Sequence, residues 1–251
     1  MKKVTVLIAG VFIVFALVSV VFCVFIDQAV LTRKGTIYKV PNNEKAIAIT
    51  FDDGPSPVWT PEILDVLKEH NVKATFFMVG KHLERYPQVG KRVAEEGHEI
   101  GNHTYLHHVL LYYTNDELHL ELKYTEYLIE SITGKKATLF RPPKAWLTGR
   151  EKEYIKDEGY KIVLWSINSK DWVSFFNVKY IVNNLLKRIK PGDIILFHDA
   201  GGTFTVEGGA RSNTVKAVRL LIEKCKARGY KFMTVSELIE AGEEKQEQNI
   251  H

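Results

Sequence analysis

Residues 46–55 have the sequence Ala-Ile-Ala-Ile-Thr-Phe-Asp-Asp-Gly-Pro. A short apolar run that ends at a Gly-Pro turn predicts a buried β-strand over residues 46–51. Similar runs predict six further strands, over residues 75–79, 99–102, 139–141, 162–165, 193–197 and 232–235. Helical patterns lie between them. The first begins at the N-cap Thr60, and five further helices are predicted over residues 81–96, 114–132, 151–158, 178–189 and 213–228. This alternation indicates an α/β fold of about seven parallel strands, closed into a barrel or wound into an open sheet.

The N-terminal segment differs in character from the rest of the chain. Lys2 and Lys3 precede an almost unbroken apolar run over residues 4–26. A helix needs about 20 residues to cross the hydrocarbon core of a bilayer, whereas the apolar part of a cleaved signal peptide spans roughly 7–15. We therefore predict one transmembrane helix, an uncleaved signal anchor over residues 1–26, in preference to a cleaved signal peptide. The positive charges before the run predict a single-pass protein of the cell membrane whose remaining residues lie outside the cytoplasm.

Three further segments follow the predicted anchor. Residues 27–44 are predicted as a polar stem, residues 45–241 as one globular domain, and residues 242–251 as a polar tail. The net charge is only +4, and no dense Lys/Arg stripe occurs, so no nucleic-acid partner is expected. The two cysteines, Cys23 and Cys225, lie in an apolar run and in a helical pattern, which predicts neither a disulfide nor a sulfur metal site. No protein partner can be inferred.

Acidic and imidazole side chains follow the predicted strands, and α/β barrels build their active sites at such strand ends. Asp52 and Asp53 are adjacent, so a bound cation or two different environments must offset their repulsion. An Asp-rich turn that caps backbone amides has the same sequence pattern. His103 and His107 are spaced to share one face of a helical turn and would suit a divalent metal such as zinc, although this spacing also arises incidentally.

Three more strand ends carry candidate residues. Arg141 precedes two prolines and has the side chain to hold a carboxylate with two parallel hydrogen bonds, although a surface arginine before a turn fits equally. Asp171 precedes Trp172, so it could orient a histidine or cap a helix beside a core aromatic ring. His198 ends a buried apolar run, and its ordinary pKa of about 6.5 suits proton donation near neutral pH. A core histidine with satisfied hydrogen bonds is the other interpretation.

Taken together, these segments resemble the polysaccharide deacetylases of carbohydrate esterase family 4, the NodB-homology domain. The resemblance covers residues 45–238 approximately, and its motifs occur in family order: TFDDGP at 50–55, HTYLH at 103–107, RPP at 141–143, DW at 171–172 and LFH at 196–198. It implies a distorted (β/α) barrel.

The resemblance also implies a role for each matched residue. The implied catalytic residues are the base Asp52 with its partner Arg141, and the acid His198 with its partner Asp171. The implied ligands of a divalent cation are Asp53, His103 and His107. That cation is usually zinc and sometimes cobalt or nickel. The implied pocket for the acetyl methyl group is lined by Leu196 and Trp172.

Two segments depart from the family pattern. Where Tyr-Gly commonly follows RPP, this chain has Lys144-Ala145. The position usually contributes a backbone N–H to the oxyanion hole, and Lys144 keeps one, but the changed side chain puts the substrate preference in doubt. The segment before Trp172 is Asn168-Ser169-Lys170-Asp171, which has one carboxylate fewer than the family pattern. Neither departure removes a ligand or an acid/base residue, so we expect an active enzyme.

The implied activity is the hydrolytic removal of acetyl groups from N-acetylated amino sugars. An enzyme anchored outside the membrane meets wall and surface glycans first, so peptidoglycan is the expected polysaccharide, followed by a chitin-like glycan. Three alternatives stay open. One is an ester deacetylase of the acetylated xylan type, another is a hydrolase of non-sugar amides, and the third is a non-catalytic glycan-binding protein on the same fold.

Overall fold

The computed structural model describes residues 10–15, 18, 29–42, 44–173, 176–201 and 210–248. Among these residues, no helix has the length and hydropathy needed to cross a membrane. The signal anchor predicted over residues 1–26 lies mostly outside the described residues. Those that are described there, 10–15 and 18, are helical and exposed. The anchor therefore stays a prediction.

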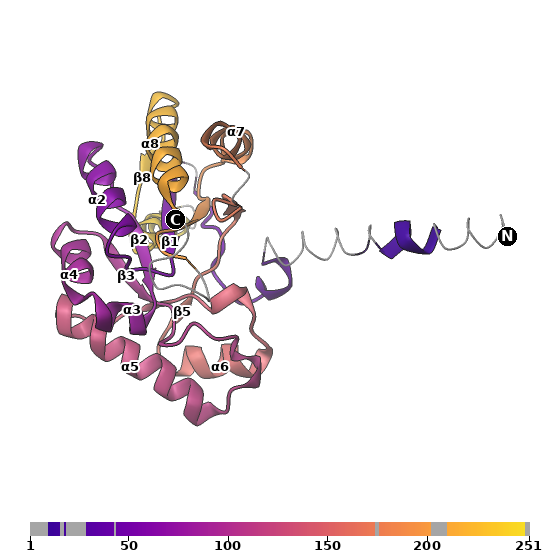
Figure 1. Cartoon of the computed structure of the whole chain (residues 1–251), viewed down its shortest axis with the longest axis vertical. Coiled ribbons are helices and arrows are strands. Elements are labelled where there is room, and N and C mark those ends of the chain that lie inside the picture. Colours follow the sequence, from indigo (N-terminus) through magenta and orange to yellow (C-terminus); the bar gives the residue numbers. More distant parts are fainter. Residues whose placement is uncertain are drawn as a thin grey trace.

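The strands form one sheet in which all paired neighbours are parallel (Figure 1). Their bounds are β1 Ala46–Asp52, β2 Thr75–Met78, β3 Glu99–Asn102, β4 Leu139–Phe140, β5 Lys161–Ile162, β6 Ile167–Asn168, β7 Ile194–His198 and β8 Lys231–Phe232. The order is β5-β4-β3-β2-β1-β7-β6, and β8 pairs with the start of β1. This curled parallel sheet confirms the expected α/β fold and its distorted barrel. The sequence had not indicated β6, which is only two residues long.

The barrel is distorted between β5 and β6, because no ladder joins these two strands in the described part of the chain. Residues of the predicted stem lie beside this gap between β5 and β6. Ile37 forms a parallel bridge with Val163, and Lys39 forms an antiparallel bridge with Asp193. The Lys39 Nζ atom also lies 2.8 Å from a carboxylate oxygen of Asp193, and Val40 is buried. Residues 29–42 thus pack against the domain instead of standing apart from it.

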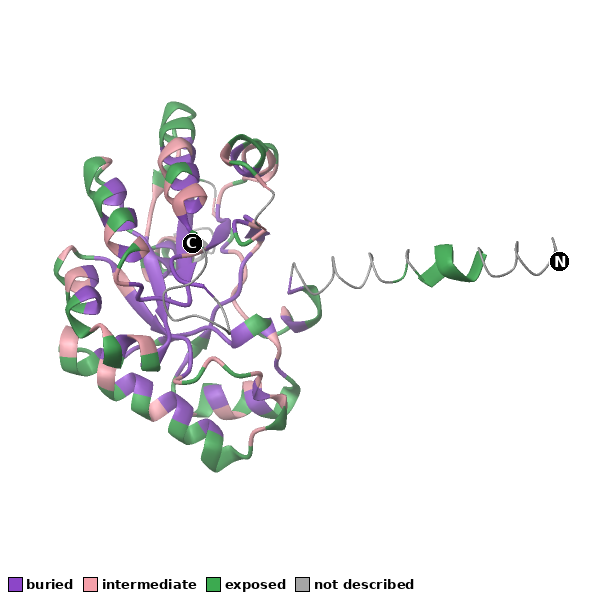
Figure 2. Ribbon diagram, viewed as in Figure 1, coloured by how far each residue is buried: buried purple, intermediate pink, exposed green. Residues whose placement is uncertain are grey.

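Helices cover the outside of the sheet, and Figure 2 shows that each buries one side and exposes the other. Their bounds are α2 Trp59–Glu69, α3 Gly80–Arg85, α4 Pro87–Glu95, α5 Asn115–Thr133, α6 Gly149–Asp157, α7 Val178–Arg188, α8 Ser212–Ala227 and α9 Val235–Gln248. The single helix predicted over residues 81–96 is two helices, because the backbone leaves the helical region at Tyr86 and Pro87 starts a new one.

The predicted N-caps have different outcomes. Thr114 caps α5 as expected: its hydroxyl accepts the N–H of Glu117 at 3.3 Å, and the Glu117 carboxylate accepts the Thr114 N–H at 2.7 Å. Thr60 was expected to cap α2 and does not, because this helix already begins at Trp59. Its hydroxyl instead donates to the buried carboxylate of Asp199 at 2.5 Å. The side chain expected to cap a helix therefore stabilises an acid at a strand end.

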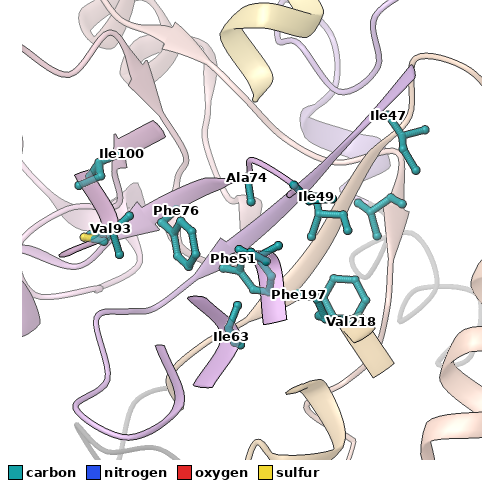
Figure 3. Close-up of a cluster of buried hydrophobic side chains, with 14 of the residues drawn as sticks. Ile47, Ile49, Phe51, Ile63, Ala74, Phe76, Val93, Ile100, Phe197 and Val218 are labelled. Carbon is teal, nitrogen blue, oxygen red and sulfur yellow. The ribbon is translucent and has the colours of Figure 1, made fainter. Parts of the chain in front are cut away.

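The core follows from the alternation of side chains along β1. Ile47, Ile49 and Phe51 point from one face of the sheet toward the helices, where they join a buried cluster with Ile63 of α2 and Val218 of α8 (Figure 3). Burying side chains of this size contributes about 1.5–3 kcal/mol each. This cluster holds the strand rigidly against two helices.

The other face of β1 presents Ala46, Ala48, Thr50 and Asp52, because successive side chains of a strand alternate between faces. The two alanines pack in a second buried cluster with apolar side chains of α9. Helix α9 extends into the predicted polar tail and places Gly242 beside Val40. A Cβ on Gly242 would lie only 2.5 Å from Cγ1 of Val40. The amino end of the barrel is thus filled, and polar side chains appear toward its carboxyl end.

Candidate active site

Four of the parallel strands deliver polar side chains to the carboxyl edge of the sheet. Asp52 ends β1 and is paired in register with His198, which ends β7. His103 follows β3, and its backbone N–H donates to the carbonyl oxygen of Met78 at the end of β2. Arg141 follows β4, and its N–H donates to the carbonyl oxygen of Asn102 at the end of β3. The structure therefore brings together the strand-end residues that the sequence singled out.

Asp53, His103 and His107 form a compact cluster of potential metal ligands. One atom from each lies within 4.8 Å of the other two. The Nε2 atoms of His103 and His107 lie 3.5 and 3.1 Å from Oδ1 of Asp53. The Nδ1 atom of His103 lies 2.7 Å from the carbonyl oxygen of Arg141, so Nδ1 carries a hydrogen and Nε2 is the nitrogen that faces the cluster. Two imidazole nitrogens and one carboxylate oxygen suit zinc, and cobalt or nickel accept the same donors.

The backbone that carries the two histidines is not the helical turn predicted from their spacing. Thr104 has φ 66° and His107 has φ 58°, so the chain follows an irregular loop. The side chain of Asn102 accepts the Thr104 N–H at 2.9 Å, and the hydroxyl of Thr104 accepts the His107 N–H at 3.1 Å. A carboxylate oxygen of Glu121 on α5 accepts the two N–H groups in between, each at 2.8 Å. The imidazoles still meet, with ring centres 5.0 Å apart.

The charges in this cluster stabilise one another. Burial alone would raise the pKa of Asp53, but the imidazoles of His107 and His103 hold it well below its usual range. Burial alone would lower the pKa of His107, but the Asp53 carboxylate raises it. Asp53 is therefore ionised near neutral pH, the state in which a carboxylate binds a cation.

Asp52 has an entirely different partner, the fully buried Arg141. The Nη1 group of Arg141 donates to Oδ1 of Asp52 at 2.6 Å and to the hydroxyl of Thr50 at 2.8 Å. Its other two donor groups reach the carbonyl oxygens of Val163 at 3.2 Å and Leu164 at 3.1 Å. Removing one partner of a buried ion pair typically costs about 3–5 kcal/mol. Arg141 thus fixes the orientation of Asp52, whose Oδ2 lies 3.9 Å from Nε2 of His103.

His198 and Asp171 form a second close pair of ionisable side chains. The Nδ1 atom of His198 lies 2.9 Å from Oδ1 of Asp171, and the backbone N–H of His198 donates to Oδ2 at 3.0 Å. The hydroxyls of Ser169 and Thr214 donate to the same carboxylate at 2.9 and 2.8 Å. Burial would lower the pKa of His198, but the Asp171 carboxylate raises it to about 8. His198 is therefore protonated near neutral pH, with Nε2 left for proton transfer.

The three predicted substrate-binding residues lie in different surroundings. Leu196 is 2% exposed and packs in a buried cluster with Ala145 and Trp165. Lys144 is exposed and has φ 56°, a left-handed backbone conformation that side chains other than glycine seldom adopt. Trp172 is 55% exposed, so it is not the core tryptophan that the alternative interpretation required. The roles of these residues in substrate binding stay predictions.

Two residues near the cluster had no role assigned from sequence. Nδ1 of His82, at the start of α3, lies 2.6 Å from the carbonyl oxygen of Asp53. Asp199 follows His198, and its Oδ1 accepts the N–H of Gly54 at 3.1 Å. Burial and the Asp53 carboxylate raise the pKa of Asp199 to about 7, although the hydrogen bond from Thr60 opposes this rise. The position of Asp199 after a buried strand was a usable signal, whereas the contact of His82 depends on tertiary structure.

Comparison with known proteins places this site in a family. Residues 39–163 match the family model described as polysaccharide deacetylase. A peptidoglycan-N-acetylglucosamine deacetylase from Bacillus cereus is 42% identical over 204 residues, which are 80% of this chain and 92% of that protein.

Solved structures agree with the sequence relatives. The crystal structure of the peptidoglycan N-acetylglucosamine deacetylase Bc1960 superposes with a TM-score of 0.77 at 35% identity and covers 82% of this chain and 93% of that one. A pseudoenzyme of carbohydrate esterase family 4 from Bacillus anthracis superposes with a TM-score of 0.73 at 28% identity, over 82% of this chain and 69% of that one. This chain therefore belongs to the polysaccharide deacetylases of carbohydrate esterase family 4.

Proposed function

We propose that this protein is a metal-dependent N-deacetylase that acts on amino sugars of an extracytoplasmic polysaccharide, with peptidoglycan as its substrate. One observation carries the proposal: a cluster of three cation ligands lies beside an aspartate held by arginine, and the same strand edge carries a histidine held by aspartate. Amide hydrolysis needs a cation or dipole to polarise the carbonyl, a base for water and an acid for the amine. The described residues include a candidate for each.

The ligand cluster has the donors for zinc, cobalt or nickel. A divalent cation held by Asp53, His103 and His107 would polarise the acetyl carbonyl and lower the pKa of water from 15.7 to about 7. The remaining steps depend on side chains of the protein and on one backbone N–H group. The backbone N–H of Lys144 is proposed to donate to the oxyanion, and one such donor is typically worth about 2.7–4 kcal/mol of barrier.

Asp52 is proposed as the general base. Its Oδ1 is engaged by Arg141, and its Oδ2 faces His103 of the ligand cluster, where the attacking water would lie. The water proton would pass to Asp52 while the water oxygen bonds to the acetyl carbon. Because Arg141 is buried and bound to four acceptors, the carboxylate cannot turn away from this position.

His198 is proposed as the general acid. Its Nδ1 atom is committed to Asp171, so the proton on Nε2 is the one that can move to the substrate nitrogen. An amine leaves only when it is protonated, so cleavage of the C–N bond requires this transfer. Leu196 and Trp172 are proposed to contact the acetyl methyl group.

The substrate and the location are supported by independent observations. The relative that shares 42% identity and the solved structure with a TM-score of 0.77 are both peptidoglycan N-acetylglucosamine deacetylases. The apolar run over residues 4–26 after Lys2 and Lys3 supports a membrane anchor with the catalytic domain outside. A membrane-attached enzyme in that position reaches the cell wall directly.

The proposal is tested by offering the purified full chain, loaded with zinc, three polymers. These are peptidoglycan, N-acetylglucosamine oligomers and acetylated xylan, and acetate release is measured for each. We expect the highest rate on peptidoglycan. A higher rate on acetylated xylan would replace the proposal with ester deacetylation, and zinc binding without acetate from any polymer would indicate a non-catalytic glycan-binding protein.

A further inference from the structure

The peptide that joins Asp53 to Gly54 is held in an unusual conformation. Asp53 has φ 77°, in the left-handed region that is uncommon for residues other than glycine. Such conformations persist where the surrounding structure enforces them. Because the Asp53 carboxylate belongs to the ligand cluster, the backbone angle at this residue decides where a cation ligand points.

Three hydrogen bonds enforce this conformation. Nδ1 of His82 lies 2.6 Å from the carbonyl oxygen of Asp53, and since a carbonyl only accepts, Nδ1 must carry the hydrogen. The N–H of the same peptide, on Gly54, donates to Oδ1 of Asp199 at 3.1 Å. The carbonyl oxygen of Gly54 then accepts the N–H of Val79 at 2.9 Å. Both polar groups of the Asp53–Gly54 peptide are thus bound by side chains.

The two side chains come from the strands on either side of β1. His82 lies in the first turn of α3, directly after β2, and Asp199 directly follows β7. Asp199 is buried and is itself fixed by the hydroxyl of Thr60. The fit is close: a Cβ on Gly54 would lie 2.2 Å from Oδ2 of Asp199, so residue 54 has to be glycine. This turn therefore cannot relax without moving one of the neighbouring strand ends.

We propose that His82 and Asp199 are positioning residues that clamp the Asp53–Gly54 peptide and so aim the Asp53 carboxylate at His103 and His107. This inference rests on the proposed role of Asp53 as a cation ligand. Neither residue belongs to the ligand cluster itself. Groups that orient metal ligands in this way typically change metal affinity by about 10–100-fold when they are replaced.

Two substitutions of His82 separate a positioning role from a general structural role. The amide nitrogen of asparagine can occupy the place of Nδ1, so His82→Asn keeps a donor for the Asp53 carbonyl. The amide of glutamine reaches only the place of Nε2, so His82→Gln keeps polarity and length but loses that donor. His119→Gln is the matched control, because His119 lies on α5 and bonds to Tyr154 and Glu158 instead.

The measurement is zinc affinity by titration calorimetry on the chelator-treated full chain, with the unfolding temperature of the metal-free protein recorded beside it. We expect His82→Gln to weaken zinc binding by about 10–100-fold at little change in unfolding temperature. His82→Asn and His119→Gln should bind like the unaltered chain. Equal affinities for the Gln and Asn variants at position 82 would overturn the clamp.

A second pair of variants covers the case in which glutamine at position 82 prevents folding. Asp199→Asn keeps an oxygen acceptor for the Gly54 N–H, whereas Asp199→Ala removes it. Tight zinc binding by Asp199→Asn and weak binding by Asp199→Ala is the expected result, and equally tight binding by both would refute the proposal. If the unaltered chain binds no zinc at all, the proposed function fails, which is distinct from failure of the clamp.

Discussion

Asp52 and Asp53 are neighbours in sequence, yet the fold gives them separate partners. Arg141 binds Asp52, while two imidazoles face Asp53. Adjacent carboxylates at one strand end would otherwise repel, and the separate partners offset that repulsion. The same division fits the proposed roles, which are proton transfer for Asp52 and cation binding for Asp53.

The roles of His198 and His103 can be separated by substitution. We expect His198→Ala to lose about 10²–10⁴-fold in the rate of acetate release while still binding zinc, because it removes an acid and no ligand. His103→Ala should lose both zinc and activity. Acetate release and zinc content are measured on the same preparations. Activity of His198→Ala equal to that of the unaltered chain would disprove its assignment as the acid.

The Asp171–His198 pair predicts a pH dependence. The pKa of His198 is raised to about 8 chiefly by Asp171, which overcomes the opposing effect of burial. The acid form is therefore lost as pH rises through about 8, and the rate should fall there. The stabilisation from protonating His198 in the fold is likewise complete below its ordinary pKa of about 6.5 and lost as pH rises through about 8.

Asp171→Asn tests this origin of the pH dependence. Loss of an opposite charge in contact typically lowers the pKa of a histidine by about 1–3 units, so the alkaline fall in rate should move to lower pH by that amount. The measurement is a pH–rate profile at saturating polymer for both proteins. An alkaline limb that stays in place would mean that another group controls it.

At the scale of elements, the sequence predicts that the chemistry gathers at strand ends, because apolar runs followed by Asp, His or Arg recur at β1, β4 and β7. It does not predict how His103 and His107 meet. Their i,i+4 spacing indicates a helical turn, but hydrogen bonds to Asn102 and Glu121 shape a loop with two left-handed residues. The bond to Asn102 is local, but the bonds to Glu121 come from α5, so the i,i+4 spacing alone does not reveal the loop.

Contacts between residues far apart in the sequence likewise cannot be predicted from local sequence patterns. Asp171 and His198 are 27 residues apart, and only the parallel pairing of β6 with β7 brings them into contact. Strand β6 has only two residues, so its sequence contains no apolar run that would predict a strand. The Asp171 segment could therefore be assigned by resemblance but not by periodicity.

Helix α5 offers a test of a predicted local interaction. Thr114 caps this helix, and the carboxylate of Glu117 accepts the Thr114 N–H. Thr114→Ala should cost about 1 kcal/mol, which is roughly 2–4 °C in unfolding temperature for a chain of this size. Thr114→Ser keeps the hydroxyl and serves as the control. Equal unfolding temperatures for the Ala and Ser variants would show that the cap is not stabilising.

At the scale of the whole molecule, residues 29–42 complete the barrel near the site. The N–H of Leu164 donates to the carbonyl of Ile37 at 2.8 Å, and the carbonyl of Leu164 accepts from Arg141. The segment before β1 therefore supports the backbone that holds Arg141 and, through it, Asp52. We therefore expect stability and activity to depend on residues that the sequence indicated only as a stem.

Two truncations test the contribution of this segment. A chain that begins at residue 29 should keep the unfolding temperature of the full chain, whereas one that begins at residue 45 should lose roughly 3–12 °C from the buried Val40 alone. The shorter chain should also release acetate more slowly. Thermal unfolding and acetate assays on both check this, and identical behaviour of the two truncations would show that residues 29–42 are dispensable.

The central claim is that the cation held by Asp53, His103 and His107 is required for deacetylation. The most direct test removes metal from the full chain with a chelator and then titrates zinc while acetate release from peptidoglycan is followed. We predict no acetate without metal and full activity at one zinc per chain, with no recovery in His103→Ala at the same concentration. Undiminished acetate release from the metal-free chain would contradict the account.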